Sequence, residues 1–126
     1  ELINGNGKVK EYYDNGKLMY EGEYLNGKGK QFKNGELIFE GEYLNGVKNG
    51  KGKEYYNGEL IFEGEYLNGK RWNGKGKEYQ NGELIFEGEY LNGKRNGKGK
   101  EYNYNGELIF EGEYLNGEKN GIGKQF

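Results

Sequence analysis

The chain has 126 residues of fourteen types, with 26 glycines and no alanine, serine, threonine, proline, cysteine or histidine. These absences exclude a serine, threonine or cysteine nucleophile, a histidine general base, a disulfide, and a zinc site built from thiolates or imidazoles. Nineteen basic and 21 acidic residues leave a formal net charge of −2, which also excludes a general nucleic-acid binder, because phosphate contacts need a strong basic excess.

An internal repeat organises the whole chain. The motif Glu-Gly-Glu-Tyr begins at residues 21, 40, 63, 87 and 111, and recurrence at such a spacing is typical of repeat proteins. Because the array starts and stops within a unit and lacks an initiating methionine, we interpret it as an excised segment or a designed array. We expect one array without separate domains over residues 1–126, divided into a partial unit at 1–20, units at 21–39, 40–62, 63–86 and 87–110, and a partial unit at 111–126.

Each unit contains two predicted strands separated by Asn-Gly dipeptides. Residues 37–44 and 51–55 form such a pair, and their apolar residues alternate with a period of two rather than 3.6. Asparagine and glycine both tolerate the positive φ angles of a type I′ hairpin turn, and both are poor helix formers. The sequence therefore predicts an all-β protein, a single elongated, twisted antiparallel sheet of successive β-hairpins with essentially no helix.

Aromatic residues mark one face of this predicted sheet. Strict alternation along residues 37–44 places the odd-numbered residues, among them Phe39 and Tyr43, on one face, and the even-numbered residues, among them Ile38 and Glu40, on the other. We interpret the rings as the core of a thin sheet. Because a single layer does not cover both of its own faces, we also expect them to form a protein-binding aromatic face. Its members are Tyr20, Tyr24, Phe39, Tyr43, Phe62, Tyr66, Phe86, Tyr90, Phe110 and Tyr114.

A glycine recurs in the middle of each predicted strand, as at Gly41 and Gly52. Glycine weakens a strand interior, so its repetition indicates a close approach, and we expect aromatic rings to lie flat over the bare backbone. On the opposite face the glutamates beside Gly41 are expected to pair with the lysines beside Gly52, as Glu40 with Lys53.

The combined pattern F-E-G-E-Y-L-N-G-x-x-N-G-x-G-K-E-Y resembles the membrane occupation and recognition nexus (MORN) repeat over nearly all of the chain. The resemblance implies an extended, twisted antiparallel sheet of successive hairpins. Residues 11–27, EYYDNGKLMYEGEYLNG, are also similar to bacterial MORN-type repeat proteins described as antitoxin-like. That second resemblance implies the same fold with a different role, the binding of a partner toxin.

Three binding functions follow as alternatives. The first is a non-catalytic scaffold that binds protein partners through the aromatic face and self-associates, as a homo-oligomer or edge to edge, through open terminal strands. The second is peripheral binding to anionic phospholipids through basic hairpin loops, and the third is antitoxin-like partner binding. The candidate lipid-contacting residues are Lys70, Arg71, Lys94 and Arg95.

Catalysis is not expected of this sequence. Glutamate pairs such as Glu40 and Glu42 recur in every unit, whereas active sites are singular, and no aspartate-rich loop has the ligand spacing of a calcium site. We therefore expect no catalytic residue, no cofactor, no metal and no nucleic-acid partner. An intracellular, cytoplasmic setting is expected, with possible attachment at a membrane surface or the cytoskeleton, because the sequence has no glycosylation sequon.

Overall fold

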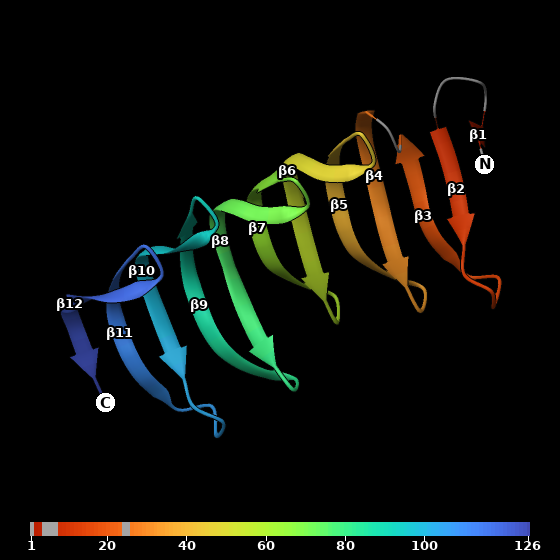
Figure 1. The fold of residues 1–126 in the computed structure, drawn as a ribbon. Helices are drawn as coiled ribbons and strands as arrows, with labels where there is room; N and C mark the ends of the chain where they lie inside the picture. Colours follow the sequence, from red (N-terminus) through yellow and green to blue (C-terminus); the bar gives the residue numbers. More distant parts are fainter. Residues whose placement is uncertain (1, 4–7, 24–25) are drawn as a thin grey trace. The chain divides into compact units, whose positions relative to one another are not determined.

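The computed structural model describes residues 2–3, 8–23 and 26–126, and only the backbone at residues 2, 3, 8, 26 and 122. Within this part of the chain the structure contains twelve strands and no helix, and the strands follow one another in a single antiparallel sheet in chain order (Figure 1). The prediction of an all-β array of hairpins is confirmed. The strands are β1 (Leu2–Ile3), β2 (Lys8–Tyr12), β3 (Leu18–Glu23), β4 (Asn26–Lys33), β5 (Glu36–Leu44), β6 (Val47–Tyr56), β7 (Glu59–Leu67), β8 (Lys70–Gln80), β9 (Glu83–Leu91), β10 (Lys94–Tyr102), β11 (Leu108–Leu115) and β12 (Glu118–Gln125).

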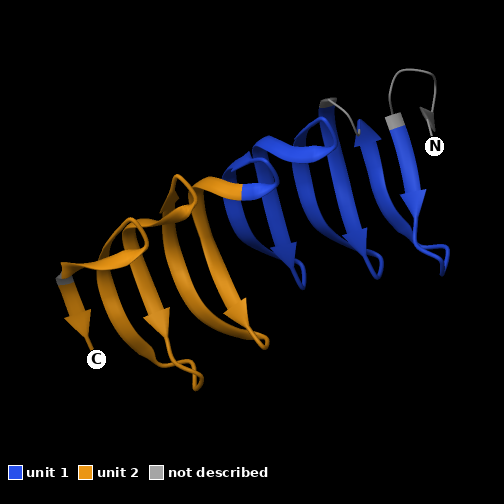
Figure 2. Cartoon of the chain, viewed as in Figure 1, with its two compact units in different colours: residues 1–70 blue, residues 71–126 orange. Residues whose placement is uncertain are grey.

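The chain forms two compact units, residues 1–70 and residues 71–126 (Figure 2). Unit 1 contains β1 to β7, and unit 2 contains β8, apart from Lys70, together with β9 to β12. Both units repeat the same pairing of a strand that contains Glu-Gly-Glu with a strand that contains Lys-Gly-Lys, as in β5 with β6 and in β9 with β10.

Tight hairpin turns form where Asn-Gly separates two strands, as predicted. At Asn45 and Gly46, between β5 and β6, the φ angles are 51° and 81°, so both central residues of the turn are left-handed as a type I′ turn requires. The dipeptide Asn49-Gly50 behaves differently, because it lies inside β6, which begins at Val47 rather than at Lys51 as predicted. Among the described residues, five Asn-Gly dipeptides lie within strands in this way, those that begin at residues 26, 49, 73, 96 and 120.

The register explains this second use of Asn-Gly. Gly41 pairs with Gly52 and Tyr43 pairs with Lys48, so the stretch of β6 between these pairs is two residues longer than that of β5. The Asn49 Oδ1 atom accepts a hydrogen bond of 3.2 Å from the backbone N–H of Asn68 in the following hairpin. Asn49 thus ties its own strand to the turn of the next repeat.

A one-residue bulge interrupts the predicted alternation near the start of β5. Gln31 pairs with Phe39 and Phe32 with Leu37, so Ile38 has no residue opposite to it. Because one extra residue inverts the facing of everything beyond it, the assignment of residue 37 to the same face as Phe39 by simple counting is wrong. Corresponding bulges occur at Met19, Ile61, Ile85 and Ile109.

The core consists of aromatic rings. Phe39, Phe62 and Phe86 are at most 1% exposed. The rings meet edge to face, for example Phe39 with Tyr66 at a centroid distance of 5.1 Å, which is the arrangement that their quadrupoles favour. Each unit therefore builds its interior from rings of neighbouring hairpins.

Candidate functional site

A row of paired glycines crosses the middle of each unit. In unit 1, β4 and β5 pair Gly29 with Gly41, and β5 and β6 pair Gly41 with Gly52. No side chain rises from this row on either face. Its members are Gly22, Gly29, Gly41, Gly52 and Gly64 in unit 1, and Gly76, Gly88, Gly99, Gly112 and Gly123 in unit 2.

Rings cover the glycine row on the apolar face, as predicted. A Cβ atom added to Gly52 would lie 2.7 Å from the Phe39 ring and 2.9 Å from the Tyr66 ring, and one added to Gly99 would lie 2.8 Å from the rings of Phe86 and Tyr114. The rings therefore occupy the space that a side chain would take.

The residues of the predicted protein-binding aromatic face lie in the interior. Tyr24 lies outside the described residues. The other nine rings are between 0% and 8% exposed, so they do not present a surface to a partner in this structure: Tyr20, Phe39, Tyr43, Phe62, Tyr66, Phe86, Tyr90, Phe110 and Tyr114.

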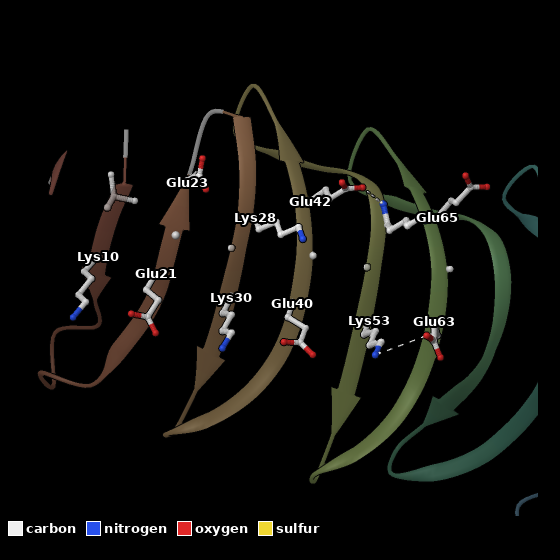
Figure 3. Close-up of a pocket in the computed structure, with 17 residues that line it drawn as sticks. Lys10, Glu21, Glu23, Lys28, Lys30, Glu40, Glu42, Lys53, Glu63 and Glu65 are labelled. Atoms are coloured by element: carbon white, nitrogen blue, oxygen red, sulfur yellow. Dashed lines mark hydrogen bonds and ion pairs between the residues drawn. The ribbon is translucent and has the colours of Figure 1, made fainter. Parts of the chain in front are cut away.

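A groove of about 1160 Å³ runs over the glycine row of unit 1, on the face opposite the rings (Figure 3). The backbone of Gly22, Gly29, Gly41, Gly52 and Gly64 lies along its middle. Charged side chains line it on both sides, and we call this site the charged groove. Its charged residues are Lys10, Glu21, Glu23, Lys28, Lys30, Glu40, Glu42, Lys51, Lys53, Glu63 and Glu65.

The register aligns these charges into rows across the strands. Along one side of the groove Lys30 pairs with Glu40, Glu40 with Lys53, and Lys53 with Glu63, as the alternation of the sequence predicts. The ion pair between Lys53 and Glu63 is 3.8 Å long, and its side chains remain 46% and 59% exposed. Exposed pairs of this kind contribute only about 0.2–1 kcal/mol, so these charges can exchange partners at little cost.

Two glutamates of the groove have further bonds that fix their position. The backbone N–H of Lys51 donates to Glu42 Oε1 at 2.7 Å. Lys51 lies in the longer stretch of β6 and has no paired residue on β5, so the Glu42 side chain satisfies this backbone donor. The hydroxyl of Tyr55 donates to Glu40 Oε1 at 2.7 Å. The spacing of the motif gives no sign of either bond, since both depend on pairing between strands.

The predicted basic loops divide into outward and inward residues. Lys70 and Lys94 are exposed, whereas Arg71 and Arg95, one residue further along their strands, are half-buried. Arg71 Nη1 donates to the backbone oxygen of Lys77 at 3.0 Å. Alternation along a strand turns every second side chain inward, so Lys70 and Lys94 are the exposed members of the predicted basic loops.

Arg95 belongs to a half-buried network in unit 2. Its guanidinium donates to Glu78 through Nε at 3.1 Å and Nη2 at 2.8 Å, and lies 4.1 Å from the centroid of the Phe86 ring. Burial acts to raise the pKa of Glu78, but hydrogen bonds from Arg95 and Tyr90 outweigh it and hold that pKa below its ordinary value. Arg95 thus lies over the core, between the Phe86 ring and the carboxylate of Glu78.

We expect Arg95→Met to lower the free energy of unfolding by about 1–3 kcal/mol, because Glu78 is left half-buried without its charged donor. The matched control, Lys94→Met, changes an exposed neighbour and should stay within about 0.5 kcal/mol of the native protein. Urea denaturation followed by circular dichroism measures both. Equal losses for the two variants would show that the network of Arg95 contributes nothing particular.

Hydrogen bonds from tyrosine hydroxyls to carboxylates predict that the folded protein loses stability at alkaline pH. The hydrogen bond to Glu40, with burial, raises the pKa of Tyr55 to about 12, and burial with a hydrogen bond to Glu87 raises that of Tyr102 to about 12, from an ordinary 10.0. The folded chain therefore keeps protons that the unfolded chain loses. Stabilisation that is complete below pH 10 should be lost as the pH rises through about 12.

This alkaline loss is measured by urea denaturation at stepped pH, with tyrosinate absorbance recorded alongside. The double variant Tyr55→Phe/Tyr102→Phe serves as the comparison, because it lacks both titrating hydroxyls. Its stability should fall less steeply above pH 10 than that of the native protein. A constant free energy of unfolding above that pH in the native protein would contradict the prediction.

Inward tyrosines form a second set of bonds that the sequence did not reveal. The Tyr90 hydroxyl donates to Glu78 Oε2 at 2.6 Å, across 12 residues. Burial and this bond raise the pKa of Tyr90. The signal in the sequence is the glutamate that follows Lys-Gly-Lys in β6, β8 and β10, but its partner lies on the next strand. The same pairs recur as Tyr66 with Glu54 and Tyr114 with Glu101.

The described ranges hold no sign of a metal site or of a helix that spans a membrane. There, no three acidic side chains come together in a way that could hold a metal ion. No helix long and apolar enough to cross a membrane is found among the same residues. The charged groove of unit 1 is therefore taken as the candidate binding site.

Comparison with known protein families agrees with the repeat pattern. The MORN repeat variant matches residues 5–26, and the MORN repeat matches residues 39–59, 62–83, 86–107 and 110–125. Comparison with curated proteins gave no significant match. The matches to the MORN repeat alone cover more than half of the chain, and each begins at the phenylalanine of a Phe-Glu-Gly-Glu-Tyr motif.

Proposed function

Because the chain belongs to the MORN repeat family, we propose that it is a non-catalytic scaffold that binds a protein partner in the charged groove of unit 1. MORN repeats support a repeat-based binding or scaffold role in general. The finer assignment, to one face of one unit, rests on a single observation. The rings of the apolar face are buried, whereas the opposite face carries a groove of about 1160 Å³ lined by exposed or half-buried charges.

The chemistry of the groove supports a polypeptide partner. Carboxylates and ammonium groups line it in similar numbers, so it offers ion pairs to both signs of charge instead of attracting one kind of ion. Proteins carry both signs along one chain, whereas an anionic lipid surface carries mainly one. The groove therefore suits a protein segment of mixed charge.

The test compares capture of partners from the native source by three forms of the protein. We expect the native chain and the control Lys17→Glu/Lys33→Glu to recover the same partner, and Lys28→Glu/Lys30→Glu to lose it. Both variants change the net charge equally, but Lys17 and Lys33 are exposed residues outside the groove. Equal recovery by all three, with circular dichroism showing intact folds, would overturn the proposal.

A further inference from the structure

The charges of the groove alternate in sign from strand to strand. Basic residues come from β2, β4 and β6, and acidic residues from β3, β5 and β7. Neighbouring strands lie about 4.8 Å apart, so the same sign returns about every 9.6 Å along the groove. Charge along the groove therefore alternates in sign with a period of two strands, about 9.6 Å.

Both sides of the groove carry the same sign on a given strand. On β4 Lys28 and Lys30 flank Gly29, and on the paired strand β5 Glu40 and Glu42 flank Gly41 (Figure 3). The charge met inside the groove therefore depends on position along it and not on which side is approached. A charged side chain of a ligand bound above one strand therefore meets the same sign of charge on either side of the groove.

The width of the groove selects an extended chain. The two flanking residues of one strand are two positions apart, which separates their Cα atoms by about 6.7 Å. This separation is smaller than the diameter of an α-helix with its side chains, about 10 Å, which favours a single extended chain over a helix. The strands beneath are already hydrogen-bonded to one another, so recognition falls to the charged side chains.

The period of the groove matches three residues of an extended chain. A polyproline II helix rises about 3.1 Å per residue and repeats every three residues, or about 9.3 Å, against about 9.6 Å for two strands. The six strands that line the groove span about 24 Å, which is the length of about eight residues in that conformation. Over this length the two periods drift apart by less than about 1 Å.

On the basis of the proposed function, we propose that the groove binds an extended segment of about eight residues in which acidic and basic side chains each recur at every third position. Its acidic side chains lie over the lysine-bearing strands and its basic side chains over the glutamate-bearing strands. The loose pair of Lys53 and Glu63, with both side chains about half exposed, supports this, because such charges are available to a ligand.

Three fluorescently labelled twelve-residue peptides test the proposal by fluorescence anisotropy at low salt. The first repeats Glu-Pro-Lys four times. The second contains the same residues in blocks, and the third repeats Glu-Pro-Pro-Lys, whose like charges recur about every 12 Å in polyproline II. We expect the first to bind at least tenfold more tightly than the others and to weaken as salt is raised. Equal affinities for all three would overturn the proposal, as would tighter binding of a helical peptide of the same charge.

Variants locate the binding within the groove. Lys28→Glu/Lys30→Glu should weaken binding of the three-residue repeat at least tenfold, and Lys17→Glu/Lys33→Glu should leave it unchanged. If the first variant fails to fold, Lys28→Gln/Lys30→Gln removes the same charges without adding repulsion, and it should still weaken binding several-fold. Unchanged binding by the folded variant would place the peptide elsewhere and overturn the proposal.

The peptide experiment and the capture experiment have separate outcomes. Loss of the native partner with Lys28→Glu/Lys30→Glu, combined with no preference among the three peptides, would leave the groove as a binding site and reject the three-residue period. Equal capture by all forms of the protein, combined with a clear peptide preference, would reject the proposed function and retain the recognition chemistry.

Discussion

Phe86→Ala is expected to lower the free energy of unfolding by about 3–5 kcal/mol, the range found for removal of a buried phenylalanine. Phe86 is 0% exposed, and its ring meets those of Tyr90 and Tyr114 edge to face at centroid distances of 6.0 and 5.3 Å. It also lies against Gly99, which has no side chain to fill the space left behind. Urea denaturation followed by circular dichroism measures the loss.

The control is Tyr104→Ala. Tyr104 is 74% exposed in the turn before β11, so its removal should change stability by no more than about 0.5 kcal/mol. Because repeats contact mainly their neighbours, hydrogen exchange in Phe86→Ala should rise most in β9 and β10. A loss below about 1 kcal/mol in Phe86→Ala would mean that the ring row is not the core of unit 2.

The sequence predicted the strands, the type I′ turns and the buried rings, because each of these depends on a local pattern. It did not separate Asn45-Gly46, which turns the chain, from Asn49-Gly50, which lies within β6. The two dipeptides are identical, and what distinguishes the second is a hydrogen bond to Asn68, 19 residues away. A contact between residues so far apart in the sequence cannot be predicted from the local pattern.

The half-buried position of Arg95 could not be predicted from the sequence for a related reason. Lys94 and Arg95 read as one basic loop, although alternation alone assigns them to opposite faces. The partner of Arg95 is Glu78, 17 residues earlier on a separate strand, and only the register brings the two together. The bulge at Ile38 was missed in the same way, because it is defined by the pairing of β4 with β5.

The sequence predicts the aromatic face as a binding surface because a single-layer sheet does not cover both of its own faces. A flat single layer does leave its rings exposed, but rings that lie on bare glycine backbone and meet edge to face cover one another. Phe39, for example, contacts Gly52, Tyr43 and Tyr66 and is 1% exposed. The same glycines carry no side chain on the opposite face. The glycine row that packs against the rings therefore also forms the middle of the charged groove.

Gly52→Ala tests this packing directly and is expected to lower the free energy of unfolding by about 3 kcal/mol, at the upper end of the cost of overpacking. The backbone of Gly52 lies outside the left-handed region, so alanine fits its conformation. The added methyl group would lie 2.7 Å from the ring of Phe39 and 2.9 Å from that of Tyr66. Both rings are buried, so neither has free space to move into.

The matched control is Gly58→Ala, in the turn between β6 and β7. There φ is +80° and no atom lies within 4 Å of the added methyl group, so the cost is backbone strain alone, about 1 kcal/mol. In the double variant Gly52→Ala/Phe39→Leu, the smaller side chain should accommodate the methyl group, and the combined loss should fall short of the sum of the two single losses by more than about 1 kcal/mol. Equal losses for the two glycine variants, or strictly additive losses in the double variant, would mean that conformational freedom and not the approach of the rings requires glycine at position 52.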